Sequence, residues 1–377
     1  MSTLKVDAIR HNSATSDAIT TAADGTCTAK ITGRTGGGGL SNRNLIINGA
    51  MQIAQRGTSS TATGHGTVDR FAVYHSTDDA PTQSQSDVGL SDLPFTEQGI
   101  TKCLKVTNGN QSGAGNAEYV EINYKCEAQD IRNSGWNYQS SSSFITLSYY
   151  VRSSVAQTYT AWITNRDGTR KNFVWSYALS ANTWTKITKV IPGDSGLTIN
   201  NDNGAAIELW FQMFYGTNYS QASPPGNNTG GWVNHDNQTV ETNDTSWYLT
   251  NDATFEITGV QLEVGNHATS FEHRSVADEL ARCQRYYEET YVMTDAGNSY
   301  VRVPVLYKVE KRAVGTPVSY AKRPDGVGTG AANKAYQADG ERTASCNYSW
   351  TGGTMLFVSG YSANTDCFSN IRVNAEL

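Results

Sequence analysis

The chain has 377 residues, of which 17% are charged and 38% hydrophobic, and it carries a net charge of −6 with a pI near 5.6. This acidic balance, without a dense Lys/Arg cluster, argues against nucleic-acid binding, and no apolar run is long enough to insert into a membrane. The 35 glycines and 20 tyrosines favour short strands joined by polar turns rather than a helical enzyme core.

Residues 1–43 are predicted to form an extended N-terminal arm followed by a glycine-rich linker. Short apolar runs flank Asp24-Gly25, which is a strong two-residue hairpin signal. The arm has too few apolar residues to fold alone, so we expect it to become ordered against copies of itself or against another protein. The candidate contact residues of the arm are apolar: Leu4, Val6 and Ile9.

Residues 44–274 are predicted to form one large antiparallel β-sandwich, because apolar runs of strand length recur without intervening helical periods. Asp69-Arg70-Phe71 introduces an early strand, and its two charged residues can be read as a surface ion pair. The later strands are expected at Cys103–Thr107, Tyr119–Tyr124, Phe144–Arg152, Tyr159–Asn165, Asn172–Ala178, Thr185–Ile191 and Ala206–Tyr215.

The last of these strands separates into two faces. Its first face is apolar and is expected in the core: Ile207, Leu209, Phe211, Met213 and Tyr215. Its second face mixes polar and aromatic residues, as a sugar-binding or subunit-packing face would: Glu208, Trp210, Gln212 and Phe214. A single tryptophan is more often core or interface than ligand contact. The glycan-contact candidates are Trp210, Gln212, Trp162, Trp232 and Trp350.

A strand near Phe255–Val264, with a bulge predicted at Gly259, is followed by a linker helix expected over residues 275–290. Ser275 with Asp278 three residues on resembles a capping box. The helix has one narrow apolar stripe, which would dock on the sandwich or on neighbouring helices around a threefold axis. The stripe consists of Val276, Leu280, Cys283 and Tyr287.

Residues 291–377 are predicted to form a small C-terminal β module, with strands at Tyr300–Val305, Met355–Ser359 and Cys367–Val373. A module of this size gains stability from oligomerisation. The six cysteines include no CxxC pair and are expected to be buried thiols, with a Cys346–Cys367 pair as the alternative.

The sequence does not indicate catalysis or a metal centre. Doubled acids such as Asp78-Asp79 and Glu288-Glu289 are usually solvated, and their spacing cannot place a glycosidase pair. The chain has no Gly-x-Ser-x-Gly elbow, no HExxH pattern and no run of β-helix repeats. We therefore expect no enzyme activity, no catalytic residue, no cofactor and no metal ligand.

Several segments resemble bacteriophage tail-fibre and other virion proteins, especially tail proteins of marine and cyanobacterial phages. They are Asn44–Met51, Asp69-Arg70-Phe71, Gln261-Leu262-Glu263, Ala268–Glu272, the Cys283–Tyr287 run and the opening Ser2–Ile9. The resemblance implies a jelly-roll sandwich similar to carbohydrate-binding modules, in a homotrimeric fibre whose N-terminal arm attaches to other tail or baseplate proteins. It also allows a structural calcium ion, which no motif supports.

On this resemblance the protein would be made in the host cytoplasm, incorporated into the virion and bound to host cell-surface polysaccharide. Two alternatives stay open. One is a purely structural baseplate or fibre-linker protein that never contacts the host. The other is a tail-associated glycan depolymerase.

Overall fold

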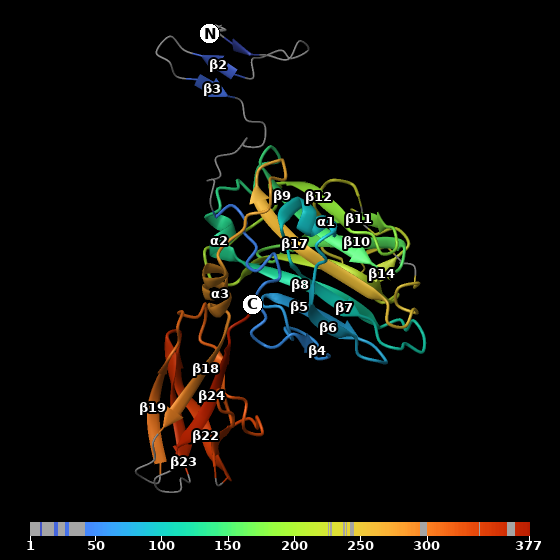
Figure 1. The fold of residues 1–377 in the computed structure, drawn as a ribbon. Coiled ribbons are helices and arrows are strands. Elements are labelled where there is room, and N and C mark those ends of the chain that lie inside the picture. Colours follow the sequence, from blue (N-terminus) through green and yellow to red (C-terminus); the bar gives the residue numbers. More distant parts are fainter. Residues whose placement is uncertain are drawn as a thin grey trace, which may run out of the picture.

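The computed structural model describes residues 8–9, 19–21, 27–29, 42–224, 226, 228–236, 238, 240–241, 245–294, 300–338, 340–359 and 366–377. The chain is mainly β, as predicted, and all of its larger sheets are antiparallel. Figure 1 shows a two-sheet sandwich with a second β unit below it and the helix α3 (Val276–Gln284) between them. Within the described ranges, no helix is both long and apolar enough to cross a membrane.

The sandwich has two six-stranded sheets. Sheet I has the order β15-β11-β10-β13-β8-β5, and sheet II the order β12-β9-β17-β7-β6-β4. The strands of sheet I are β5 (Phe71–Ser76), β8 (Tyr119–Glu127), β10 (Gln157–Asn165), β11 (Lys171–Leu179), β13 (Ala205–Tyr215) and β15 (Val233–Asn234). Those of sheet II are β4 (Ser59–Ser60), β6 (Thr82–Asp87), β7 (Lys102–Thr107), β9 (Phe144–Ser153), β12 (Thr185–Pro192) and β17 (Thr254–Val264). The remaining elements of this region are α1 (Leu93–Gln98), α2 (Ala128–Arg132) and the parallel pair β14 (Ser220–Gln221) and β16 (Val240–Glu241).

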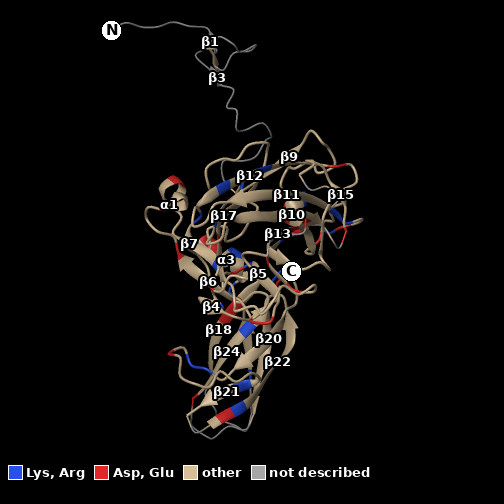
Figure 2. Ribbon diagram, turned by 90° about the vertical axis from the view of Figure 1, so that its right-hand side faces the viewer, with Lys and Arg blue, Asp and Glu red and all other residues tan. Residues whose placement is uncertain are grey.

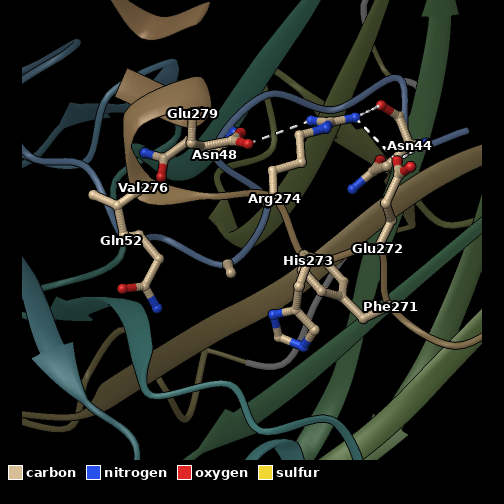
Figure 3. Close-up of a pocket in the computed structure, with 11 residues that line it drawn as sticks. Asn44, Asn48, Gln52, Phe271, Glu272, His273, Arg274, Val276 and Glu279 are labelled. Carbon is tan, nitrogen blue, oxygen red and sulfur yellow. Dashed lines mark hydrogen bonds and ion pairs between the residues drawn. The ribbon is translucent and has the colours of Figure 1, made fainter. Parts of the chain in front are cut away.

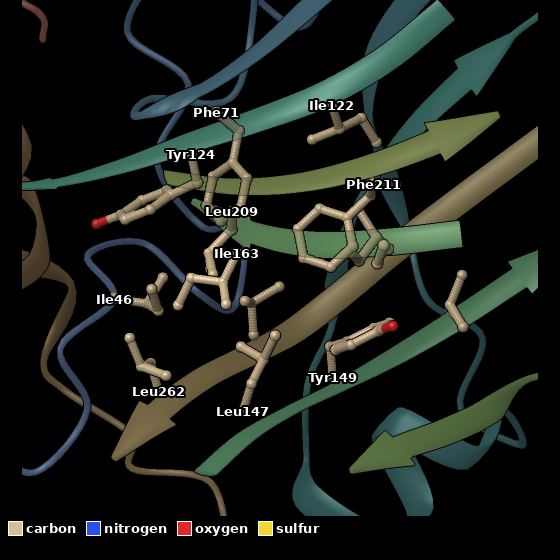
Figure 4. Close-up of a cluster of buried hydrophobic side chains, with 14 of the residues drawn as sticks. Ile46, Phe71, Ile122, Tyr124, Leu147, Tyr149, Ile163, Leu209, Phe211 and Leu262 are labelled. Atoms are coloured by element: carbon tan, nitrogen blue, oxygen red, sulfur yellow. The ribbon is translucent and has the colours of Figure 1, made fainter. Parts of the chain in front are cut away.

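The main hydrophobic core lies between the two sheets, as Figure 4 shows. Leu209 and Phe211 of sheet I face Leu147 and Tyr149 of sheet II, and all four side chains are fully buried. Alternation along each strand sends every second side chain into this layer, which is the expected jelly-roll sandwich. The predicted bulge in β17 is confirmed: its register with β9 shifts between Thr258 and Gln261, and Gly259 has a positive φ of 62°.

The N-terminal arm contributes a small antiparallel sheet of β1 (Ala8–Ile9), β2 (Ile19–Thr21) and β3 (Cys27–Ala29). The strands that flank Asp24-Gly25 pair with each other as predicted, with Thr21 opposite Cys27. Of the candidate arm residues, Leu4 and Val6 lie outside the described residues. Ile9 is 54% exposed, so the part of the chain that the structure describes does not cover it.

The predicted cap of α3 is confirmed, because the Ser275 hydroxyl accepts the backbone N–H of Asp278 at 3.1 Å. The predicted extent of the helix is wrong: it ends at Gln284, and Tyr287 already begins strand β18 (Tyr287–Thr294). From Tyr287 onward the chain pairs with β24 (Cys367–Asn374) of the second β unit. This long-range pairing cannot be seen in the local spacing of apolar residues.

The apolar stripe docks on the sandwich of its own chain. Leu280 and Cys283 pack with Ile47 and Ile53 of the sandwich. Val276 is left 63% exposed, and Tyr287 is buried as a strand residue rather than as part of the helix. The stripe therefore packs against the sandwich of the same chain and does not require a helix from a second chain.

The C-terminal β unit is a curled sheet of order β18-β24-β21-β22-β23-β19, with β20 also paired to β24. Its further strands are β19 (Tyr300–Leu306), β20 (Thr316–Tyr320), β21 (Lys334–Gln337), β22 (Gly340–Trp350), β23 (Gly353–Ser359) and β24 (Cys367–Asn374). Its core is small, and one wholly buried ion pair, Lys311–Glu288 at 2.7 Å, lies at its upper end. The Lys311 ammonium also donates to the carbonyl of Gln284 at 2.6 Å, which ties this unit to the end of α3.

Asp69 and Arg70 are buried at the junction of the two β units, so the reading of this pair as a surface ion pair is wrong. The Arg70 guanidinium bonds to the Glu376 carboxylate, which the chain brings back to the sandwich after β24, and it lies 3.5 Å from the centre of the Tyr286 ring. Asp69 instead accepts the backbone N–H of Gln55 at 3.0 Å. The two charged residues thus have separate partners, because the second β unit covers this end of the sandwich.

A second polar network joins α3 to the start of the sandwich (Figure 3). The Arg274 guanidinium lies between Glu279 on the helix and the Asn44–Glu272 pair, with the nearest carboxylate oxygens at 3.5 and 3.2 Å. The Asn44 side-chain oxygen accepts the N–H of Leu262 at 3.1 Å. Residues from the segments quoted above therefore converge on one place, and their local role is to join the sandwich to the helix.

Candidate functional site

A groove of about 500 Å³ lies on the outer face of sheet I. Its strand residues come from β8, β10 and β13 and alternate with core residues of the same strands: Glu121, Trp162, Thr164, Glu208, Trp210 and Tyr215. Its rim comes from the connecting segments: Arg166, Arg170, Asn218, Tyr219 and His235. Figure 2 shows basic and acidic residues interspersed on both β units, so the character of this groove depends on its own lining and not on a charged face.

The floor of the groove is a pair of stacked indoles. Trp162 of β10 and Trp210 of β13 are direct cross-strand partners, and their rings lie 5.7 Å apart at an interplanar angle of 10°. Trp162 is buried beneath its neighbours, whereas Trp210 is half-buried. The two candidates lie 48 residues apart in the sequence, and strand pairing places them together. Such a surface can support the apolar face of a sugar ring.

A bulge corrects the predicted faces of β13. The register between β13 and β8 shifts between Gln212 and Phe214. Beyond the shift, the Phe214 side chain points into the core, where its ring stacks on that of Tyr248 with the two ring centres 4.0 Å apart. Tyr215 turns outward to the groove, where its ring lies edge-on to Trp162 at 5.7 Å. The prediction had the two residues exchanged, because one extra residue in a strand reverses every side chain after it.

Glu121 closes one side of the groove. Its carboxylate accepts the hydroxyl of Tyr215, and its side chain is almost wholly removed from water. Burial raises the pKa of Glu121 to about 8, and the nearby Glu208 carboxylate adds to the rise. At neutral pH Glu121 is therefore mostly a protonated acid, which can donate a hydrogen bond to a ligand.

Glu208 is 1% exposed and has two cationic neighbours, Lys125 at 3.5 Å and Arg166 at 3.3 Å. The oxygen nearest Arg166 has no hydrogen-bond partner in the protein, and neither does the buried indole nitrogen of Trp210. Buried polar atoms are normally satisfied, so these two atoms call for water or a ligand hydroxyl. Glu208 belongs to the polar and aromatic face that the sequence predicts for β13. Glu121 was not predicted, although strand alternation puts it on the outer face of β8.

The other glycan-contact candidates do not line the groove. Gln212 is fully buried opposite Thr160, and both polar atoms of its amide lack a protein partner. Trp232 is buried in the sandwich core, where its indole nitrogen donates to the Pro192 carbonyl at 2.7 Å. Trp350 is 40% exposed on the C-terminal unit, far along the chain from the groove. The five candidates therefore separate into one pair in the groove and three positions elsewhere.

A smaller cavity of about 190 Å³ lies beside α3, between Gln52, His273 and Val276 (Figure 3). The terminal nitrogens of Arg274 in its wall already bind the Ile46 carbonyl at 3.0 Å and neighbouring carboxylates. The polar groups of this wall already bond to one another across the contact between α3 and the sandwich. The groove on sheet I is therefore the better candidate for a ligand site. Among the described residues, no cluster of three or more His, Cys, Asp or Glu could hold a metal ion.

No family model matches the sequence, and no curated protein matches it. Solved structures with a similar fold include an enzymatically active domain of bacteriophage CBA120 tailspike protein 4, at 9% identity and a TM-score of 0.33, over 59% of this chain and 22% of that one. The chain thus spans about a fifth of that tailspike.

Two smaller proteins are matched over almost their whole length. A putative sugar-binding protein from Bacteroides thetaiotaomicron has 11% identity and a TM-score of 0.29, over 59% of this chain and 100% of that one. A family 11 carbohydrate-binding module from Clostridium thermocellum, in complex with a mixed-linked tetrasaccharide, has 11% identity and a TM-score of 0.27, over 57% and 98%. Likenesses this weak carry no argument about function.

Proposed function

We propose that this protein is a glycan-binding adhesin of a bacteriophage particle and that the groove on sheet I is its glycan site. The observation that carries the proposal is the Trp162–Trp210 stack beside buried polar atoms that accept or donate no hydrogen bond within the protein. An indole face packs on the apolar face of a sugar ring, and these polar atoms gain hydrogen bonds from its hydroxyls. The virion part of the proposal is supported by the sequence resemblance alone.

In this proposal the N-terminal arm attaches the protein to other tail or baseplate proteins, and three copies present three grooves to a repetitive host polysaccharide. Several weak sites on one particle raise the overall affinity by avidity. The native mass of the purified protein tests the trimer. A monomer at micromolar concentration would contradict that arrangement and leave the groove as a single site.

The experiment that tests the groove is binding of the full chain to host cells and to their extracted surface polysaccharide. We expect Trp210→Ala to weaken binding about tenfold, since it removes the stacking surface. The matched variant is Trp350→Ala, which removes an exposed tryptophan from the other β unit and should leave binding unchanged. Thermal unfolding of both variants controls for misfolding.

The opposite result, with only Trp350→Ala losing affinity, would move the site to the C-terminal unit and contradict the groove. If the wild-type protein ignores both cells and polysaccharide, the adhesin proposal fails and a structural baseplate or fibre-linker role replaces it.

One observation favours glycan hydrolysis as a second candidate. Two carboxyl groups in opposite environments face the same groove: Glu121, whose pKa burial raises to about 8, and Glu208, which lies beside two cations. A protonated acid with an ionised partner is what glycosidases use. An adhesin should release no new reducing ends from the polysaccharide. Release that is abolished by Glu121→Gln would establish the enzyme instead.

A further inference from the structure

We infer that the groove takes a glycan with an anionic substituent, a carboxylate or a sulfate, held by Arg170 next to Arg166. The inference rests on the proposed glycan-binding function and adds the chemical class of the ligand. The chain as a whole has a net charge of −6, but the lining of this groove includes two arginines, Arg166 and Arg170.

Two arginines, Arg166 and Arg170, line the groove. Arg166 pairs with Glu208 at 3.3 Å, and Lys125, which does not line the groove, lies 3.5 Å from the same carboxylate. Arg170 lines the same groove and makes no ion pair with the described part of the chain. His235 on the rim has its pKa lowered by burial, so it is neutral at pH 7 and adds no charge. Arg170 is therefore the cation of the groove lining that is left to bind an anionic group of the ligand.

The remaining acid of the groove does not cancel the charge of Arg170 at neutral pH. Glu121 is faced by Tyr215 and Glu208 from β13, by Tyr74 from β5 and by Tyr119 from its own strand. None of these groups is a cation that would favour the ionised carboxylate. With burial added, the pKa of Glu121 is about 8, so most copies carry a neutral acid at pH 7.

The position of the two arginines fits an anionic group on a stacked sugar. Arg166 and Arg170 stand on either side of the turn that joins β10 to β11, where Gly168 has a positive φ of 65°. A guanidinium presents paired donors in a fixed fork that matches carboxylate and sulfate oxygens. Trp162, Thr164 and Arg166 follow at every second position, so the arginines adjoin the stacked indoles along the groove. The net charge of −6 leaves no long-range attraction for polyanions, so recognition must come from these contacts.

The experiment measures binding of the full chain to matched glycan pairs by isothermal titration calorimetry. Alginate oligosaccharides are compared with their carboxyl-reduced products, and carrageenan oligosaccharides with their desulfated products. We expect at least one anionic member to bind about tenfold tighter than its neutral product, because a charge-assisted contact is lost. Arg170→Gln should remove that preference and leave the neutral product unaffected. Lys186→Gln, which removes an exposed charge from sheet II, is the control and should change neither.

Raising the pH supplies an independent readout. Ionisation of Glu121 above about pH 8 adds a negative charge to the groove, so binding of the anionic member should weaken between pH 7 and pH 9. Glu121→Gln should abolish this weakening. If neutral and anionic members bind equally and Arg170→Gln has no effect, the inference is overturned while glycan binding stands. If no member of any pair binds, the proposed function fails with it.

Discussion

Replacing Arg70 with methionine should weaken the attachment of the C-terminal β unit to the sandwich. The Arg70 side chain is 1% exposed, bonds to Glu376, donates to the Lys125 carbonyl at 2.7 Å and covers the ring of Tyr286. Methionine keeps much of the volume and removes the charge, so the Glu376 carboxylate stays buried without its closest partner. Breaking a buried ion pair in this way costs about 3–5 kcal/mol. Arg56 lies 3.2 Å from the same carboxylate and offsets part of the loss, so we expect the lower end of that range.

The assay is urea denaturation followed by tryptophan fluorescence, together with amide hydrogen exchange over residues 285–290. Exchange reports local opening of the junction even if the two β units unfold separately. Arg302→Met is the matched control, because Arg302 is exposed on β19 and its loss should cost well under about 1 kcal/mol.

A stability loss below about 1 kcal/mol for Arg70→Met would refute the reasoning, and so would an equal loss for the control. The double variant Arg70→Met/Glu376→Gln gives a further check. It no longer has an unpaired buried carboxylate, so it should recover part of the stability that the single variant loses.

Three further predictions concern other positions. Gly49→Ala should cost about 2–3 kcal/mol in urea denaturation, because the added Cβ would lie 2.1 Å from the Val260 carbonyl oxygen, whereas Gly113→Ala meets nothing within 4 Å and should be neutral. Ser275→Ala should cost about 1 kcal/mol through loss of the α3 cap, and Ser275→Asp should keep most of it. The cations around Glu376 outweigh its burial and lower its pKa from 4.5 to about 2, so the stability it contributes is present above pH 4.5 and lost as the pH falls through about 2. Acid unfolding of Glu376→Gln should lack that component, and an unchanged pH profile would contradict the assignment.

The strand pattern of the sandwich could be predicted from the sequence because its periodicity is strong. Each expected strand from residue 103 to residue 215 matches an observed strand within three residues at either end. Strand β6 (Thr82–Asp87) was missed, since its sequence TQSQSD is polar throughout and gives no alternation of apolar residues. The short helices α1 and α2 are not predicted either, because six and five residues are too few to show a helical period.

Errors arose where tertiary contacts decide the outcome. The bulge in β13 exchanged Phe214 and Tyr215, and nothing in the local residues signals it. The sequence suggests that Asp69 and Arg70 are surface charges, but the segment after β24, which contains Glu376, lies against this end of the sandwich. The sequence predicts both Trp162 and Trp210 as glycan contacts, but only strand pairing shows that they stack. Sequence patterns therefore give the elements and their exposed faces, while long-range pairing selects which of those faces forms a site.

The junction at Arg70 also bears on how such proteins can exchange parts. Arg70 belongs to the sandwich, Tyr286 to the connection and Glu376 to the segment after β24, and the three side chains meet in one buried cluster. A recombination event that replaced everything after α3 would keep the arginine and remove its carboxylate. A chimaera cut at that point should be less stable at the junction unless the incoming unit supplies an acid at the position of Glu376. Exchange of one β unit without the other therefore carries a stability cost at this cluster.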